Sequence, residues 1–320
     1  MSQVETDGKA DSDPARPIEP AFAIATAPSY VDTLFWGPDG LRPGWGLAFY
    51  GIAFLALQWL VSRLASAQDL GAGGLWSMLL EKVGDFLAAV LPALILARVE
   101  RRPWGAYGLP VNQAFGRRFW TGALWGFLAI SLLLLILYEN SAFNPGHIIL
   151  HRWRLLRLAA FWLVYFVLVG LFEDFLLRGY SLFTLARGIG FWPAAVALSC
   201  VFGLLHLPNT GEHWSGVLLA AFIGLFFCVT LRRTGTLWFA IGFHTAWDWG
   251  ESFIYSVPDS GWVAPGHLLS SSCHGPDWVT GGSVGPEGSV FCVVVMALVW
   301  IAFHRVYARK QVDSRTAGSG

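Results

Sequence analysis

Eight apolar stretches of about 20 residues each recur along this 320-residue chain, and they constrain its fold more than any other feature. A helix needs about 20 mostly apolar residues to cross a bilayer. Only 13% of the residues are charged, whereas a soluble domain carries roughly 25%, so a soluble fold could not cover its surface. The expected fold class is all-α, a polytopic integral membrane helix bundle with about eight transmembrane helices. These spans cover about 44–62, 78–97, 119–138, 158–178, 191–207, 215–231, 236–256 and 289–306.

Polar segments flank the apolar region and divide the chain into three parts. Residues 1–40 are largely polar and Pro-rich and lack the features of a signal peptide, so we expect a disordered cytoplasmic tail. Residues 41–310 are expected to form the transmembrane helical domain, with a motif-bearing core at 155–256. Residues 311–320 are expected to be a short C-terminal tail.

The distribution of charge predicts the orientation and excludes some partners. The 21 basic and 21 acidic residues cancel, so nucleic acid is not an expected partner. Lys and Arg collect at 98–118, 232–233 and 305–310, which places both termini in the cytoplasm and the loop 257–288 outside. The arginines at 152–157 lie on the other side, against this rule. The four cysteines form no CxxC pair, so neither a disulfide framework nor a thiolate zinc site is indicated.

Three clusters of ionisable side chains lie within the apolar stretches. Each such side chain costs at least ~2.5–3.5 kcal/mol at the centre of a membrane helix, so such residues are candidates for function. They lie near the end of the fourth stretch, at the end of the fifth and within the seventh. The residues are Glu173, Asp174 and Arg178, then His206, then His244, Asp248 and Glu251.

Spacing predicts that two of these residues lie at the same depth. Gly188-Ile189-Gly190 is a turn signal between the fourth and fifth helices. Glu173 and His206 are equally far from the centre of this turn. If both helices continue to the turn, the two side chains lie about 25 Å along their helices from it.

Other pairs are predicted by the four-residue period of a helix. His244 and Asp248 share one face of the seventh helix. Asp174 and Arg178 have the same spacing, so we assign them a structural ion pair that leaves Glu173 free. In the second stretch, Lys82 is expected to pair with Asp85 in an interfacial turn.

These motifs resemble the CPBP family of intramembrane endopeptidases, which includes the type II CAAX prenyl proteases and the bacterial Abi-type proteins. The family pattern is EExxxR on one helix, FxxxH on the next, and HxxxN or HxxxD further on. The matching residues are Glu173, Asp174 and Arg178, then Phe202 and His206, then His244 and Asp248. The Gly-rich loop at 275–288 also resembles bacterial members. Asp174 stands where the family pattern has Glu, which shortens its reach and leaves the ion pair as its expected role.

The resemblance implies hydrolysis of a peptide bond within the membrane. The expected substrate is a membrane-associated or lipidated protein or peptide, and the expected location is the bacterial cell membrane. By analogy, Glu173 and His206 activate a water molecule, while His244 and Asp248 stabilise the oxyanion. Asp174 and Arg178 support these four residues.

The residue types leave alternatives open. Glu173, His206, His244 and Asp248 are also an acceptable ligand set for a divalent metal such as zinc, so the cofactor is either none or such a metal. A catalytically idle scaffold or immunity-type protein would be expected to have lost one of the four residues, and all four are present. An ion- or proton-coupled transporter often carries inverted repeats, and the two halves of this sequence show no such repeat.

Overall fold

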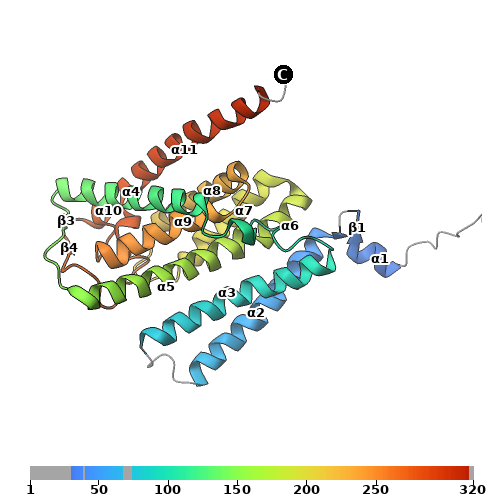
Figure 1. Ribbon diagram of the computed structural model, residues 1–320, viewed down its shortest axis with the longest axis horizontal. Helices are drawn as coiled ribbons and strands as arrows, with labels where there is room; N and C mark the ends of the chain where they lie inside the picture. The colour runs from blue at the N-terminus through green and yellow to red at the C-terminus, as the bar shows by residue number, and fades with distance from the viewer. Residues whose placement is uncertain (1–29, 39, 68–73, 317–320) are drawn as a thin grey trace, which may run out of the picture.

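Helices account for most of the computed structural model, which describes residues 30–38, 40–67 and 74–316 (Figure 1). The strands in these residues form two small antiparallel pairs, β1 (Trp36–Gly37) with β2 (Gly40–Leu41) and β3 (Phe143–Asn144) with β4 (Ser272–Cys273). The predicted all-α class is therefore confirmed. The longer helices are α2 (Pro43–Ala67), α3 (Leu75–Val99), α4 (Arg117–Glu139), α5 (Arg152–Arg178), α6 (Tyr180–Ile189), α7 (Phe191–His206), α8 (Trp214–Thr234), α9 (Trp238–Asp248) and α11 (Val290–Thr316). The short elements are α1 (Tyr30–Phe35), η2 (Val111–Gln113), the π-helix η3 (Trp249–Ile254), α10 (Asp277–Thr280) and η4 (Pro286–Gly288).

Each of the eight predicted apolar stretches is mainly helical. Among the described residues, five helical segments are long and apolar enough to cross a membrane. Helix α7 is apolar but shorter, α3 carries charged residues near its start, and α9 has only 11 residues. The protein is therefore an integral membrane protein, while the cytoplasmic placement of both termini stays a prediction. The five segments are Pro43–Ser66, Arg117–Glu139, Arg152–Ile189, Trp214–Thr234 and Val290–Tyr307.

Helix α9 lies inside the bundle, and every residue in it except His244 is buried. Glycines bring α9 and α4 into backbone contact, because a Cβ atom added at any of them would meet a carbonyl group of the other helix. Gly122 and Gly126 of α4 face the carbonyls of Phe239 and Phe243, and Gly242 of α9 faces that of Phe119. This packing fixes the helix that carries His244 and Asp248.

We expect Gly126→Ala to destabilise the bundle by about 1–3 kcal/mol, because the new methyl group would force α4 away from α9. Thermal unfolding of the purified protein in detergent measures the effect. Gly51→Ala in α2 is the matched control, since nothing lies within 4 Å of its added Cβ. Equal unfolding temperatures for the two variants would contradict the close packing.

Both predicted tails differ from the structure where it describes them. The predicted N-terminal tail covers residues 1–40, of which 1–29 and 39 lie outside the described residues. The remainder forms α1 and a β-pair, and Phe35 packs on Trp45 with ring centroids 4.8 Å apart. At the other end, α11 continues to Thr316, beyond the predicted boundary at 310.

The turn near Gly190 is present, but the helix before it is not continuous. Gly190 has a φ of 85° and separates α6 from α7, as predicted. Gly179 separates α5 from α6, and a Cβ atom there would collide with the carbonyl of Phe175. After the break, the ring of Tyr180 packs in an aromatic cluster. Its centroid lies 4.9 Å from that of Tyr50 and 4.9 Å from that of Tyr107. The predicted straight path of about 25 Å from the turn to Glu173 is therefore wrong.

Candidate active site

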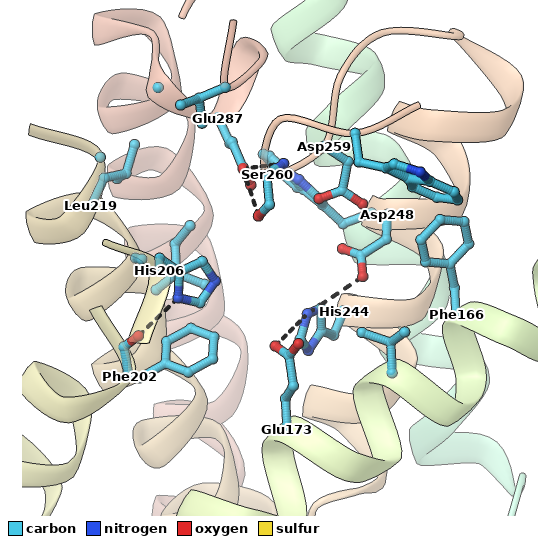
Figure 2. Close-up of a pocket in the computed structure, with 18 of the residues that line it drawn as sticks. Phe166, Glu173, Phe202, His206, Leu219, His244, Asp248, Asp259, Ser260 and Glu287 are labelled. Carbon is cyan, nitrogen blue, oxygen red and sulfur yellow. Dashed lines mark hydrogen bonds and ion pairs between the residues drawn. The ribbon is translucent and has the colours of Figure 1, made fainter. Parts of the chain in front are cut away.

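A cavity of about 200 Å³ opens between α5, α7, α8, α9 and the loop that follows η3. Its walls bring together all four residues that the sequence predicted as catalytic. Figure 2 shows Glu173 of α5 and His244 of α9 on one side and His206 of α7 on the other. Asp248 lies on α9 one turn beyond His244.

His244 is surrounded by three carboxylates. Its Nε2 atom lies 3.7 Å from Glu173 Oε2 and 3.5 Å from Asp248 Oδ2. Its Nδ1 atom lies 3.5 Å from Asp174 Oδ2. Gly170 of α5 allows this approach, because it lies directly against the start of the His244 side chain and the Ile241 carbonyl. The imidazole is therefore held between α5 and the next turn of α9.

Asp174 and Arg178 form the predicted ion pair, with 2.7 Å between Oδ1 and Nη1. The Arg178 Nε atom also donates to the carbonyl of Gly224, and its guanidinium lies over the rings of Phe202 and Phe227. Both charged side chains are almost completely buried. The pair stands behind His244 and does not line the cavity, so it supports the imidazole from within the bundle.

His206 is oriented by its own helix. Its Nδ1 atom donates to the carbonyl of Phe202 at 2.8 Å, because a carbonyl oxygen can only accept. The Nε2 atom is then the ring nitrogen available to a group in the cavity, and in neutral imidazole it is an acceptor. The ring also packs edge-on against Phe202, with centroids 4.6 Å apart. Phe202, the first residue of its motif, therefore sets the direction of the histidine.

The loop after η3 and the short helix η4 add polar groups that the sequence motifs did not assign. Asp259, Ser260 and Glu287 line the end of the cavity away from Glu173 (Figure 2). Glu287 Oε1 accepts hydrogen bonds from the backbone N–H and the hydroxyl of Ser260, at 2.6 and 2.9 Å. Burial raises the pKa of Asp259 and of Glu287, and the negative charge of Glu287 raises the pKa of Asp259 further. Glu287 was part of the recognised Gly-rich loop, but Asp259 carries no sequence signal beyond its residue type.

Lys82 of α3 also lines the cavity. It forms the predicted ion pair with Asp85 at 2.8 Å, and Asp85 accepts a second hydrogen bond from Gln58 of α2. The prediction that Lys82 belongs to an interfacial turn did not include its position in the same cavity as Glu173.

The geometry does not fit a zinc site formed by the four residues Glu173, His206, His244 and Asp248. Zinc ligands lie 2.0–2.2 Å from the metal when they are nitrogen or oxygen, so the ligand atoms must converge. In the described part of the chain, the residues whose ligand atoms converge within 4.8 Å are Glu251, Asp259 and Glu287. His206 lies on the opposite wall from His244 (Figure 2). We therefore derive no catalytic step through a metal at these four residues.

Comparison with known proteins supports the predicted resemblance. Residues 155–250 match the family model described as type II CAAX prenyl endopeptidase Rce1-like. This range contains all three motifs and all four predicted catalytic residues. The predicted similarity to CAAX-type proteases is confirmed for the matched region, which covers less than a third of the chain. Neither the curated proteins nor the solved structures gave a match.

Proposed function

We propose that this chain is an intramembrane endopeptidase that hydrolyses a peptide bond of a membrane-associated or lipidated protein or peptide. The observation that carries the proposal is the convergence of Glu173, His206, His244 and Asp248 on one cavity. Three separate helices supply these residues, and the match to the endopeptidase family covers all of them.

Glu173 is the proposed general base. Its side chain is 31% exposed, which gives it access to water in the cavity, and its carboxylate faces the partly buried imidazole of His244. The carboxylate takes a proton from a water molecule, and the resulting hydroxide attacks the carbonyl carbon of the substrate. His206 Nε2 holds the same water from the opposite wall. When the C–N bond breaks, Glu173 returns the proton to the leaving amine.

His244 is the proposed oxyanion donor. An imidazole among three carboxylates is well placed to carry a positive charge, and its N–H groups can donate to an oxygen that becomes negative in the transition state. The low local dielectric of a buried site strengthens this interaction. Asp248 positions the imidazole and does not itself need to donate.

Asp248→Asn is expected to keep activity within ~10-fold of wild type, because asparagine retains the oxygen that faces His244 Nε2. The similar-sized Asp248→Leu, which removes that oxygen, is expected to lose at least ~100-fold. Initial cleavage rates of both folded variants make the comparison. If the asparagine variant is as inactive as the leucine variant, the charge of Asp248 is required and its role as a positioning residue is wrong.

Peptide cleavage by the purified, reconstituted protein tests the function. The substrates are three sets of membrane-anchored peptides, which are unmodified and apolar, acylated, or prenylated. Mass spectrometry of the products identifies any new terminus. We expect discrete cleavage within at least one set by wild type. Folded wild-type protein that cleaves none of the three sets would contradict the proposal.

A further inference from the structure

Three carboxylates form a second cluster beyond the proposed catalytic residues. Glu251 lies on η3, Asp259 in the loop after it, and Glu287 on η4. One oxygen of each residue lies within 4.8 Å of the others. Asp259 and Glu287 face the cavity at its loop end (Figure 2), and Glu251 is completely buried.

Hydrogen bonds orient Glu251 and Glu287, and in each carboxylate these bonds go to one of the two oxygens. The indole N–H of Trp247 donates to Glu251 Oε2 at 2.6 Å. Ser260 donates twice to Glu287 Oε1. Such donors fix the direction of a carboxylate in the way that outer partners orient metal ligands.

The second carboxylate oxygen of Glu251 also indicates a ligand, on evidence separate from the clustering of the three acids. Glu251 Oε1 is buried and has no hydrogen-bond partner among the described residues. A buried acceptor without a donor loses its hydration and gains nothing in return, so such atoms usually mark a missing partner. With Oε2 bonded to Trp247, Oε1 is the oxygen that Glu251 has available for the cluster.

Within the described ranges, no Lys or Arg forms an ion pair with Glu251, Asp259 or Glu287. The acids that pair with basic residues there include Asp85, Glu100 and Asp174. The described groups that face the cluster from other elements are Asp248 of α9, Glu173 of α5 and Glu212, which add negative charge, and His206 of α7 across the cavity. Several carboxylates crowded in a buried site need either protons or a cation.

We propose that Glu251, Asp259 and Glu287 bind a hard divalent cation, with calcium as the best fit. The three side chains offer only oxygen, which Ca²⁺, Mg²⁺ and Mn²⁺ prefer over the nitrogen and sulfur ligands of zinc. Calcium–oxygen bonds of ~2.3–2.6 Å let one ion reach oxygens up to ~5 Å apart, whereas magnesium spans about 4 Å. The ion would tie η3, the following loop and η4 together at the loop end of the cavity.

Binding of Mn²⁺ to the EDTA-treated, full-length protein in detergent tests the site by electron paramagnetic resonance. We expect wild type to bind one Mn²⁺ at concentrations of ~1 mM or below, and Ca²⁺ to displace it. Asp259→Asn and Glu287→Gln should each weaken binding at least ~10-fold, because each removes one charged ligand. The amides relieve repulsion among the carboxylates, so both variants are expected to fold.

Glu212→Gln is the matched control, because Glu212 lines the same cavity but lies outside the cluster. It should bind Mn²⁺ as wild type does. No bound Mn²⁺ in wild type, or equal loss in all three variants, would overturn the site. The measurement does not use peptidase activity, so it is independent of the proposed function.

Thermal unfolding gives a second readout with a defined pH dependence. The pKa of Asp259 and of Glu287 is raised in the folded protein, so folding stability without the cation falls as pH rises above the ordinary carboxyl range. Ca²⁺ competes with the retained protons and should stabilise wild type more at pH 8 than at pH 5. Asp259→Asn should show a much smaller Ca²⁺ shift. A Ca²⁺ shift that is equal in wild type and Asp259→Asn would contradict the assignment.

Discussion

Glu173→Gln is expected to lower peptide hydrolysis at least ~100-fold while the protein remains folded, because glutamine keeps the shape of the side chain but cannot accept the proton. Glu173 is partly exposed in the cavity, so the substitution buries no new unpaired charge. The measurement is kcat/KM for the best substrate in the reconstituted system. Glu212→Gln, a neutralised acid on the same cavity wall, should retain wild-type activity and serves as the control.

The double variant Glu173→Gln, His206→Ala tests whether the two residues act on the same water. His206→Ala alone should cause a loss comparable with that of Glu173→Gln. If both act in one step, the double variant should lose far less than the product of the two single losses. A fully multiplicative loss would show that the two residues act independently and would contradict the shared water.

Arg178→Ala is expected to be the most damaging substitution for folding, with a cost of about 3–5 kcal/mol. It would leave the buried Asp174 without its 2.7 Å partner and remove the guanidinium that packs on the rings of Phe202 and Phe227. The yield of monodisperse protein after detergent extraction measures the effect.

The double variant Arg178→Ala, Asp174→Asn is the control for Arg178→Ala. It removes the uncompensated charge as well, so it should recover part of the folded yield. A normal yield of Arg178→Ala with activity abolished would show that the arginine takes part in the chemistry, and the structural assignment would be wrong.

Features that depend on short stretches of sequence could be predicted well. The apolar helices follow from composition over about 20 residues, and the ion pair of Asp174 with Arg178 follows from one helical turn. The pair of Lys82 and Asp85 is another example. Such contacts depend on the geometry of a single helix and require no knowledge of how helices pack.

Features that depend on packing between helices could not be predicted in the same way. The equal depth predicted for Glu173 and His206 depends on a continuous helix up to Gly190, but Gly179 breaks that helix. The close approach of His244 to Glu173 and Asp174 depends on the contact of α5 with α9 at Gly170. Residue spacing within one helix cannot predict a contact between two helices. The residue types alone did identify these side chains as candidates for function.

The carboxylate cluster of Glu251, Asp259 and Glu287 is the clearest example of a feature that the sequence did not predict. Glu251 could be placed on the same helical face as Asp248, but Asp259 and Glu287 come from a Gly- and Pro-rich loop without periodicity. Their positions depend on turns and on hydrogen bonds from Ser260. A sequence pattern based on helices has no means of locating them.

The most direct test of the proposed peptidase is cleavage in water enriched in ¹⁸O, with products analysed by mass spectrometry. Wild type is expected to release a peptide whose new C-terminal carboxyl carries one ¹⁸O atom, because the attacking oxygen comes from water. Folded Glu173→Gln should give little of this product under the same conditions. Equal amounts of ¹⁸O-labelled product from wild type and Glu173→Gln would contradict the assignment of Glu173 as the base.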